Sequence, residues 1–494
     1  MEKALEFYKK QRRKMVMFNY LGFIVSWDME TDAAENSIMA DSEQVAVMSE
    51  INYQLTTDPQ FEQAVETLYN NRSKLDEVLR HEIEVMYKDI AETKKIPQEE
   101  YVAYSELTSK AYPVYVKAKT ENNFELFRPY LEKIVDYCRK MTKWLATSET
   151  QGYDVLLDKY EPHYNQAKYD KFFDALRERL VPFVKQATAK PYVAPKWATQ
   201  TFDVDKQKEF CEYLRDVMCF DKSRGIMKVS EHPFTSGFGT DDVRITNHYY
   251  PNLFDSSIFS VIHETGHALY EQQCDKSLNG TLSGGGASLG MHESQSRFYE
   301  NLIGRSKAFW AVHYGKLQQT FPAQLGKVSL DEFYKHINNV QRSFIRTEAD
   351  ELTYPLHVML RYEIEQKLIA GELEVKDLPE YWNNKFTEYF GITPPNDAQG
   401  VLQDVHWAYG NFGYFPTYAL GSAIASQLYY HMNKDFDVEK SLACGSTAKV
   451  NEWLKEHVHK YGSSKYPDEI LRLATGEDFN PDYYIDYLIA KYSK

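Results

Sequence analysis

Cysteine is scarce in this chain of 494 residues, and the five cysteines present follow no paired or metal-binding spacing. They are Cys138, Cys211, Cys219, Cys274 and Cys444, with no CxxC among them. An odd and widely spaced set indicates neither a disulfide framework nor a cysteine-ligated zinc site. This composition favours a reducing compartment, and we therefore expect a cytoplasmic protein.

Positive charge is in deficit as well. The 57 Lys and Arg residues face 72 Asp and Glu residues, which gives a formal net charge of −15 at pH 7. Binding to nucleic-acid phosphates depends on concentrated Lys and Arg, and the chain has no basic patch of that kind. We therefore expect no nucleic-acid partner.

Long apolar runs are missing too, and the nearest approach to one is Met15–Trp27. Basic residues precede this segment, in the order of a secretory signal. However, it contains Asn19, Tyr20 and Gly22, lacks a small-x-small cleavage site and is too short to cross a membrane. We interpret it as a buried helix and expect no membrane partner.

Strand-like sequence is confined to a few segments, of which the best is Asp242–Tyr250. Most other segments have the apolar spacing of amphipathic helices, and the clearest are Gln44–Leu55, Phe61–Asn70, Leu75–Thr93, Pro97–Lys119, Phe124–Thr147, Lys168–Ala189, Met291–Ser306, Leu330–Arg342, Leu356–Ala370, Leu378–Phe390 and Thr417–Asn433. The Pro-rich stretch Lys190–Thr201 is the best candidate for a boundary. We expect an N-terminal helical lobe, residues 1–190, and a second lobe, residues 191–494, that together form one unit.

His263, Glu264 and His267 form an HExxH motif within Phe254–Gln273, a segment with helical apolar spacing. Two histidines four residues apart point the same way from a helix, so both rings can reach one divalent metal. The adjacent glutamate is placed to polarise a metal-bound water as general base. The motif predicts a metal-dependent peptidase in the second lobe. The strand-like Asp242–Tyr250 just before it would offer an edge to which an extended substrate adds itself.

A catalytic zinc needs a third protein donor, and two local candidates fail. Glu271 stands two turns beyond His263, about 12 Å along the helix axis, which is too far to share one ion with it. The extended pattern HExxHxxGxxH would require Gly and His where this chain has Tyr270 and Gln273. A carboxylate from the helix that follows the Gly-rich turn remains, and spacing alone leaves two candidates, Glu293 and Glu300.

Six motifs follow one another along the second lobe. They are HPF at His232–Phe234, DVRIT at Asp242–Thr246, HExxH at His263–His267, HESQ at His292–Gln295, IRTEAD at Ile345–Asp350 and GVLQDVHW at Gly400–Trp407. Together they resemble the signature set of the carboxypeptidase Taq family of metallocarboxypeptidases. SWDMET at Ser26–Thr31 and the helix-rich pattern extend the resemblance over nearly the whole chain. Asp32–Asn36 does not reproduce the Pro/Gly stretch usual after the family's WD segment, and this departure leaves the catalytic assignment untouched.

The resemblance implies a mainly α, multi-helix peptidase of two lobes, with a deep central cleft and a small β-sheet beside the HExxH helix. It implies one Zn²⁺ per chain, or Co²⁺ in its place, on His263, His267 and Glu293. Glu264 would then be the general base and proton shuttle. The resemblance further implies a homodimer that acts on peptides and removes their C-terminal residues with broad preference.

The developing oxyanion needs a hydrogen-bond donor besides the metal. A spacing similar to the His…Tyr pair of related helical zinc peptidases favours His406 and Tyr418 for this role, with Tyr414 as second choice. The alternative is that these aromatic residues only line a core.

An exopeptidase must also bind a free carboxylate, which a fixed guanidinium does with two parallel hydrogen bonds. Arg346 of IRTEAD is the first choice, and its alternative role is a salt bridge with Glu348 or Asp350. For Arg244 of DVRIT, substrate binding, a restriction on how far the substrate enters, and an ion pair with Asp241 or Asp242 all remain open. His232 of HPF is a further candidate for substrate binding.

Three other functions compete with a carboxypeptidase. A helical zinc endopeptidase or oligopeptidase would share HExxH and the downstream glutamate, but it would cleave peptides blocked at the C-terminus. A zinc aminopeptidase would need an anionic group for the free amine, and the chain has no GxMEN-like segment. A catalytically silent binding protein would be expected to lose Glu264 or a metal ligand, and none of these residues is lost.

Overall fold

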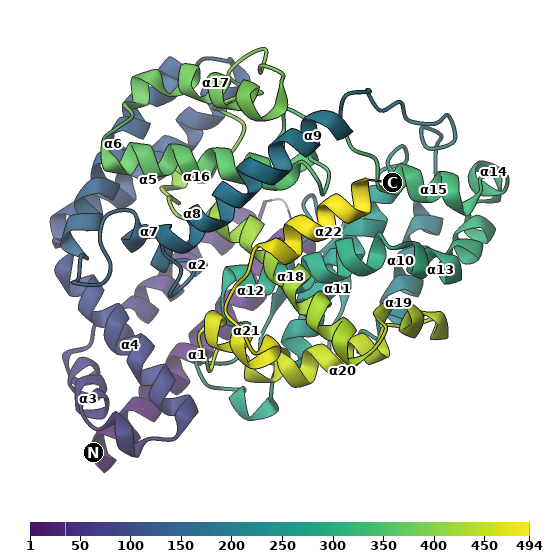
Figure 1. Ribbon diagram of the computed structural model, residues 1–494. Helices are drawn as coiled ribbons and strands as arrows, with labels where there is room; N and C mark the ends of the chain where they lie inside the picture. The colour runs from purple at the N-terminus through teal and green to yellow at the C-terminus, as the bar shows by residue number, and fades with distance from the viewer. Residues whose placement is uncertain (35, 494) are drawn as a thin grey trace.

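The computed structural model of the protein describes residues 1–34 and 36–493. Along this described chain the first six helices follow one another across short turns (Figure 1). They are α1 (Glu2–Thr31), α2 (Ile38–Thr56), α3 (Pro59–Tyr69), α4 (Glu77–Lys95), α5 (Gln98–Thr120) and α6 (Phe124–Trp144). Asp58 and Asp76 cap α3 and α4, because their carboxylates accept hydrogen bonds from amide N–H groups of the first turn.

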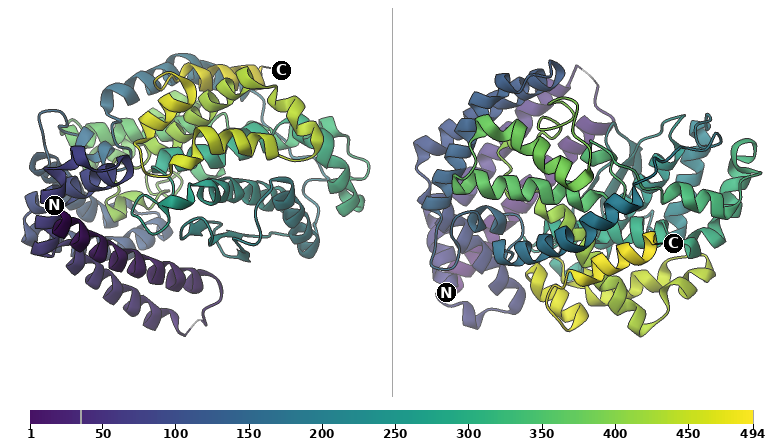
Figure 2. Two further views of the ribbon diagram at one scale, coloured as in Figure 1. Left: turned by 90° about the horizontal axis from the view of Figure 1, so that it is seen from below. Right: turned by 45° about the horizontal axis from the view of Figure 1, so that its top comes forward.

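The apolar segment Met15–Trp27 lies within α1, and the expectation that it is a buried helix is wrong on burial. Met15 and Trp27 are buried, whereas Met17 is 48% and Leu21 is 40% exposed. Figure 2 shows the reason, since α1 and α2 lie side by side along the lower edge of the molecule in its left-hand view. Each helix is therefore covered on one side only.

Two helical runs that the sequence predicts as continuous contain a widened, π-helical turn. The run predicted at 168–189 becomes α8, the π-helical turn and α9, and the run predicted at 291–306 becomes α12 followed by π-helical residues. Their bounds are Gln166–Ala175, Leu176–Leu180 and Val181–Ala187 for the first, and Leu289–Arg297 and Phe298–Gly304 for the second. The second π-helical turn directly follows the helix that carries Glu293.

The described residues form one sheet of three short strands, β1 (Met227–Val229), β2 (Thr235–Gly237) and β3 (Val243–Asn247), in the order β1-β3-β2. Ile245 of β3 pairs with β1 in parallel and with β2 in antiparallel orientation. The strand predicted at Asp242–Tyr250 is thus the central one, and the prediction that its edge is open to a substrate is wrong. The free edge beside the metal helix belongs to β2.

α11 (Phe254–Gln273) covers the segment predicted from the HExxH motif and packs against α10 (Val204–Val217) and α12 near the centre of Figure 1. Two glycines allow this close approach. A Cβ at Gly266 of α11 would lie 2.9 Å from the Cα of Ser296 in α12, and a Cβ at Gly421 of α18 would lie 2.7 Å from the Cβ of Glu293. Gly266 therefore sets how closely α11 approaches α12, and Gly421 sets how closely α12 approaches α18.

The other helices surround this centre. Their bounds are α7 (Asp154–Asp158), α10 (Val204–Val217), α13 (Lys307–Thr320), α14 (Pro322–Leu325), α15 (Leu330–Ile337), α16 (Tyr354–Ala370), α17 (Leu378–Phe390), α18 (Pro416–Asp435), α19 (Val438–Ser441), α20 (Ala448–His457), α21 (Pro467–Thr475) and α22 (Asp482–Tyr492). α15 ends five residues before the predicted Arg342. No helix among the described residues is both long and apolar enough to span a membrane.

The larger hydrophobic core draws on residues from Ala111 to Leu488, and a smaller one on residues from Tyr8 to Ile83. The larger core thus includes side chains from both sides of residue 190. The division of the chain into lobes at that residue stays a prediction.

Candidate metal centre

His263 and His267 leave the same face of α11, and Glu293 reaches them from α12. Ligand atoms from the three side chains all lie within 4.8 Å of one another. Nε2 of His263 is 3.7 Å, and Nε2 of His267 is 3.5 Å, from Oε2 of Glu293. One ion at the centre of such a triangle has room for donor distances of about 2.0 to 2.2 Å, so the residues fit a zinc-type ion.

The far side of His263 is held by ion pairs. Its Nδ1 lies 2.9 Å from Oε2 of Glu300, which also accepts a hydrogen bond from Arg297 at 3.1 Å. Arg305 donates to the other oxygen of Glu300 at 3.2 Å, and Arg297 donates to Glu293 at 2.7 Å. Although burial opposes it, Arg297 and His263 hold the pKa of Glu300 well below its usual value. Glu300, left open as a ligand from the sequence, thus contacts His263 on the side away from the other donors.

The far side of His267 is held by a second histidine. Nδ1 of His267 lies 2.7 Å from Nδ1 of His292, and Nε2 of His292 lies 2.7 Å from Oε1 of Glu271. A carboxylate only accepts hydrogen bonds, so His292 donates from Nε2, and in its neutral form it then accepts at Nδ1. His267 must then donate from Nδ1, and this tautomer leaves its Nε2 free for a metal.

Glu264 is 7% exposed and lies beside the triad. The hydroxyl of Thr235, on β2, is 2.7 Å from Oε2 of Glu264 and 2.9 Å from its backbone carbonyl oxygen. Burial raises the pKa of the Glu264 carboxyl. A raised pKa brings a carboxylate closer to the range in which a general base works well near neutral pH.

Arg346 is buried in a cluster with two other charged side chains. It donates to Asp404 at 2.9 and 3.2 Å and to the Tyr354 hydroxyl at 3.1 Å. Arg361 donates to the other oxygen of Asp404 at 2.7 Å. The alternative of a salt bridge from Arg346 to Glu348 or Asp350 is therefore wrong. Two guanidinium groups share one carboxylate, so the cluster carries an uncompensated positive charge.

His406, Tyr414 and Tyr418 stand together next to this cluster. Nε2 of His406 lies 3.3 Å from the Tyr418 hydroxyl, and the Tyr414 ring centroid is 5.3 Å from each of the other two. Burial lowers the pKa of His406 to about 4, so its ring is neutral near pH 7. Burial raises the pKa of both tyrosines, and the Glu293 carboxylate contributes to the rise. Both hydroxyls therefore remain protonated donors.

Arg244 and His232 have other surroundings. Arg244 donates to both oxygens of Asp242 at 2.8 Å, and its guanidinium lies over the rings of Phe23 and Trp27 of α1, at 5.0 and 5.5 Å. The ion pair with Asp242 is thus the one the structure contains. His232 is exposed in the loop between β1 and β2, where its carbonyl accepts a hydrogen bond from the Ser230 hydroxyl at 2.6 Å.

A model of the carboxypeptidase Taq (M32) metallopeptidases matches residues 7–492. The chain belongs to this family. Carboxypeptidase 1 of Bacillus subtilis (strain 168) is 42% identical over 474 residues, 95% of this chain and 94% of the relative. Thermostable carboxypeptidase 1 of Pyrococcus furiosus is 35% identical over 489 residues, 97% of this chain and 96% of that one. The crystal structure of the M32 carboxypeptidase from Deinococcus radiodurans R1 superimposes with a TM-score of 0.94 at 31% identity, covering 99% of both chains.

These similarities span nearly the full length, and the chain is therefore a mainly helical metallocarboxypeptidase. The resemblance inferred from the six motifs is confirmed. Four contacts at this site were not predicted from the sequence. They join Thr235 with Glu264, His292 with His267, Arg297 with Glu293, and Asp404 with Arg346. His292 and Asp404 stand inside the HESQ and GVLQDVHW motifs, which was the available signal. Thr235 and Arg297 lie next to motifs but outside them, so no sequence motif pointed to these two residues.

Proposed function

We propose that this metallocarboxypeptidase releases residues one at a time from the free C-terminus of peptides, with broad preference for the residue released. The observation that carries the proposal is the net positive charge of a cluster next to the His406–Tyr418 pair. Arg346 and Arg361 share the single carboxylate of Asp404 in this cluster. A substrate carboxylate would supply the missing negative charge. An endopeptidase has no need of such a cluster.

His263, His267 and Glu293 would hold the metal, and Glu264 would act as general base. A bound divalent ion of the zinc type lowers the pKa of water from about 15.7 to near 7 and polarises a carbonyl group. Glu264, oriented by Thr235, would take the proton of the attacking water and pass it to the leaving amine. Its buried position excludes bulk water from that transfer.

His406 and Tyr418 would donate hydrogen bonds to the oxyanion, with Tyr414 as second choice for the tyrosine. Both are neutral donors near pH 7, because burial lowers the pKa of His406 and raises that of Tyr418. Such donors stabilise the transition state more than the substrate, since negative charge develops on the oxygen only as the bond to water forms.

Arg346 would bind the terminal carboxylate of the substrate. A guanidinium has five N–H groups, and Asp404 and Tyr354 account for three of them in this structure. One N–H on each terminal nitrogen remains for a carboxylate. Arg244 and His232 stay candidates for more distant substrate contacts, and the free edge of β2 would align the extended peptide by main-chain hydrogen bonds.

We further propose one Zn²⁺ per chain, with Co²⁺ as an alternative, because two imidazoles and one carboxylate form the His₂Glu donor set of catalytic zinc sites. The five cysteines are all free thiols, which suits the proposed cytoplasmic location. The proposed homodimer rests on the family resemblance alone.

A peptide and its C-terminally amidated twin test the function directly. The protein is incubated with each, with and without a chelator, and the products are identified by mass. We expect stepwise loss of residues from the free C-terminus, none from the amide, and no cleavage after chelation. Internal cleavage, or equal cleavage of the amide, would overturn the proposal and favour the endopeptidase alternative.

A further inference from the structure

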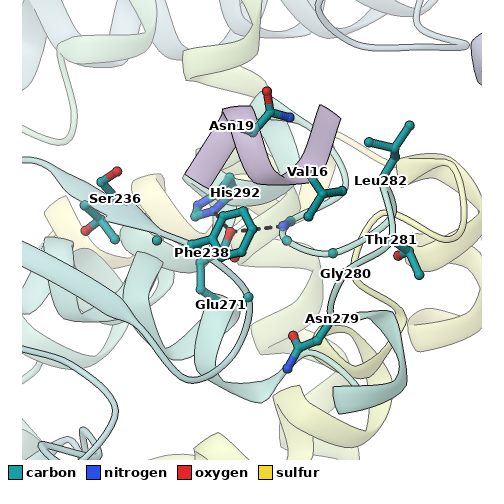
Figure 3. A pocket seen from close by; sticks show the side chains of 16 residues that line it. Val16, Asn19, Ser236, Phe238, Glu271, Asn279, Gly280, Thr281, Leu282 and His292 are labelled. Carbon is teal, nitrogen blue, oxygen red and sulfur yellow. Dashed lines mark hydrogen bonds and ion pairs between the residues drawn. The ribbon is translucent and has the colours of Figure 1, made fainter. Parts of the chain in front are cut away.

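A cavity of about 380 Å³ opens beside the metal centre (Figure 3). Three parts of the chain form its walls: α1, the β2 strand with the turn after it, and the Gly-rich segment after α11. These walls include Val16 of α1, Thr235 and Phe238 from the strand and turn, and Leu282 from the Gly-rich segment. His292 and Glu271 form its inner end.

The cavity and the Arg346 cluster are connected to the metal centre through different residues. Thr235 and His292 line the cavity, and they contact Glu264 and the metal ligand His267. The Arg346 cluster is instead connected to the ligands through Tyr354, whose ring Arg297 covers while it donates to Glu293. A peptide held by its carboxylate at Arg346 and cleaved at the metal would then have this cavity available to the residues that precede the scissile bond.

The free edge of β2 leads in the same direction. Its residues Thr235–Gly237 border both Glu264 and the cavity. A peptide that adds to this edge as an extended strand points alternate side chains to the same face. One of the residues before the scissile bond can therefore place its side chain in the cavity.

The cavity contains a carboxylate oxygen that accepts no hydrogen bond from a described residue. Oε1 of Glu271 accepts hydrogen bonds from His292 and from the Gly286 amide. Oε2 accepts none from the described residues and lies next to Gly285, in the cavity wall. Within the same described chain no Lys or Arg forms an ion pair with Glu271. Glu271 therefore presents to the cavity a carboxylate oxygen that has no hydrogen-bond donor among the described residues.

We propose that this cavity binds a cationic side chain, Lys or Arg, located one to three residues before the scissile bond of the substrate. Its methylene groups would lie against Val16, Phe238 and Leu282, and its charged head would bind Oε2 of Glu271. The inference rests on the proposed carboxypeptidase function and adds to it a class of preferred substrate.

The test uses the metal-loaded protein and three sets of peptides with one constant C-terminal residue. In each set a single position, one, two or three residues before the scissile bond, carries lysine, norleucine or glutamate. We expect kcat/KM to be about tenfold higher for lysine than for norleucine at one of these positions, and lowest for glutamate, as for a charge-assisted hydrogen bond. Equal rates for lysine and norleucine at all three positions would overturn the inference.

Two variants locate the effect. Glu271→Gln should abolish the preference for lysine, and its metal content is measured in parallel because Glu271 also holds His292. Val16→Lys, which puts a cation in the cavity from α1, should reduce the preference without touching that pair of residues. Met17→Lys is the matched control, since Met17 is 48% exposed on the same helix and lies outside the cavity. A lysine preference that survives in both cavity variants would assign it to another site.

Failure of the inference differs visibly from failure of the proposed function. If the function is wrong, no residue is released from the free C-terminus of any peptide in the three sets. If only the inference is wrong, residues are released at rates that ignore the upstream side chain.

Discussion

His263 and His267 stand one turn apart on α11, yet their surroundings differ. On the His263 side, Glu300 and Glu293 face Arg297 and Arg305, so that two carboxylates meet two guanidinium groups. On the His267 side a second histidine, His292, and a single carboxylate, Glu271, follow, with no arginine among the described contacts, and a cavity opens next to them.

Both arrangements select the same tautomer, because each makes the ligand donate from Nδ1 and keeps Nε2 for the metal. They differ in charge balance. On the His263 side each carboxylate is paired with a guanidinium group of the protein. On the His267 side, Glu271 has no guanidinium partner among the described residues, and a ligand in the cavity can bind its Oε2. The comparison separates what holds the metal from what can also bind substrate.

The largest effect is expected from Glu264→Gln, which belongs to neither side. It deletes the proposed base and keeps all three ligands, so turnover should fall about 1000-fold while metal affinity stays within a few-fold. Single-turnover kinetics and metal titration of the same preparation measure the two quantities. Normal turnover in this variant would contradict the assigned mechanism.

Glu300→Gln and Glu271→Gln compare the two sides directly. Glu300 contacts the ligand His263 directly, and Glu271 acts on the ligand His267 through His292, so each variant should weaken metal binding by about 10- to 100-fold. Glu300→Gln should also lower the free energy of unfolding by about 1.5 to 3 kcal/mol, because it takes one partner from the partly buried Arg297 and Arg305. Glu271→Gln breaks no arginine pair and should cost clearly less stability.

Chelator competition gives the metal affinities, and urea unfolding of the metal-free proteins gives the stabilities. The double variant is the control for independence, since the two carboxylates share no contact and their stability losses should add. Equal losses of stability in the two single variants would mean that the difference in charge balance has no energetic consequence.

The sequence predicted best what depends on neighbours along the chain. α11 begins and ends where apolar spacing placed it, at Phe254 and Gln273, because no proline or charge cluster interrupts that pattern. The sheet order was out of reach, since strands of three to five residues can pair in several ways. Contacts such as Asp404 with Arg346 join residues 58 positions apart, and they depend on how α16 and the following loop pack.

α12 carries residues of both sides, His292 and Glu293, and its first turn is held by Glu161. This carboxylate is fully buried and accepts hydrogen bonds from the Ser288 hydroxyl at 2.7 Å and from the Gly290 amide at 2.8 Å. Burial, with a smaller contribution from the nearby Asp468, raises the pKa of Glu161 to about 7. The folded protein therefore keeps a proton that the unfolded chain, with a pKa near 4.5, has already released.

The stability that this proton provides is complete below about pH 4.5 and is lost as the pH rises to about 7. Glu161→Gln should remove this loss, so its unfolding free energy should fall less than that of the wild type between pH 5 and pH 7.5. Urea unfolding across this range measures the slope. Glu149→Gln on the exposed surface is the control and should reproduce the wild-type slope. An unchanged slope in Glu161→Gln would show that Glu161 is ionised throughout.

The smallest effect is expected from Gly266→Ala, which acts on both sides at once. The added Cβ would lie 2.9 Å from the Gln295 carbonyl oxygen and from the Cα of Ser296, so α11 and α12 must move apart. Overpacking of this kind costs about 1 to 3 kcal/mol. Because the movement separates both histidines from Glu293, metal affinity should fall together with stability.

Gly315→Ala is the matched control for that variant, because Gly315 lies in helix α13 with no atom within 4 Å of the new Cβ. It should stabilise the protein by about 0.4 to 1 kcal/mol and leave metal affinity unchanged. If Gly266→Ala lowered stability but left metal affinity unchanged, the distance between α11 and α12 would not govern the ligand geometry. The side chains hydrogen-bonded to His263 and to His267 would then position the ligands by themselves, without the contact between α11 and α12.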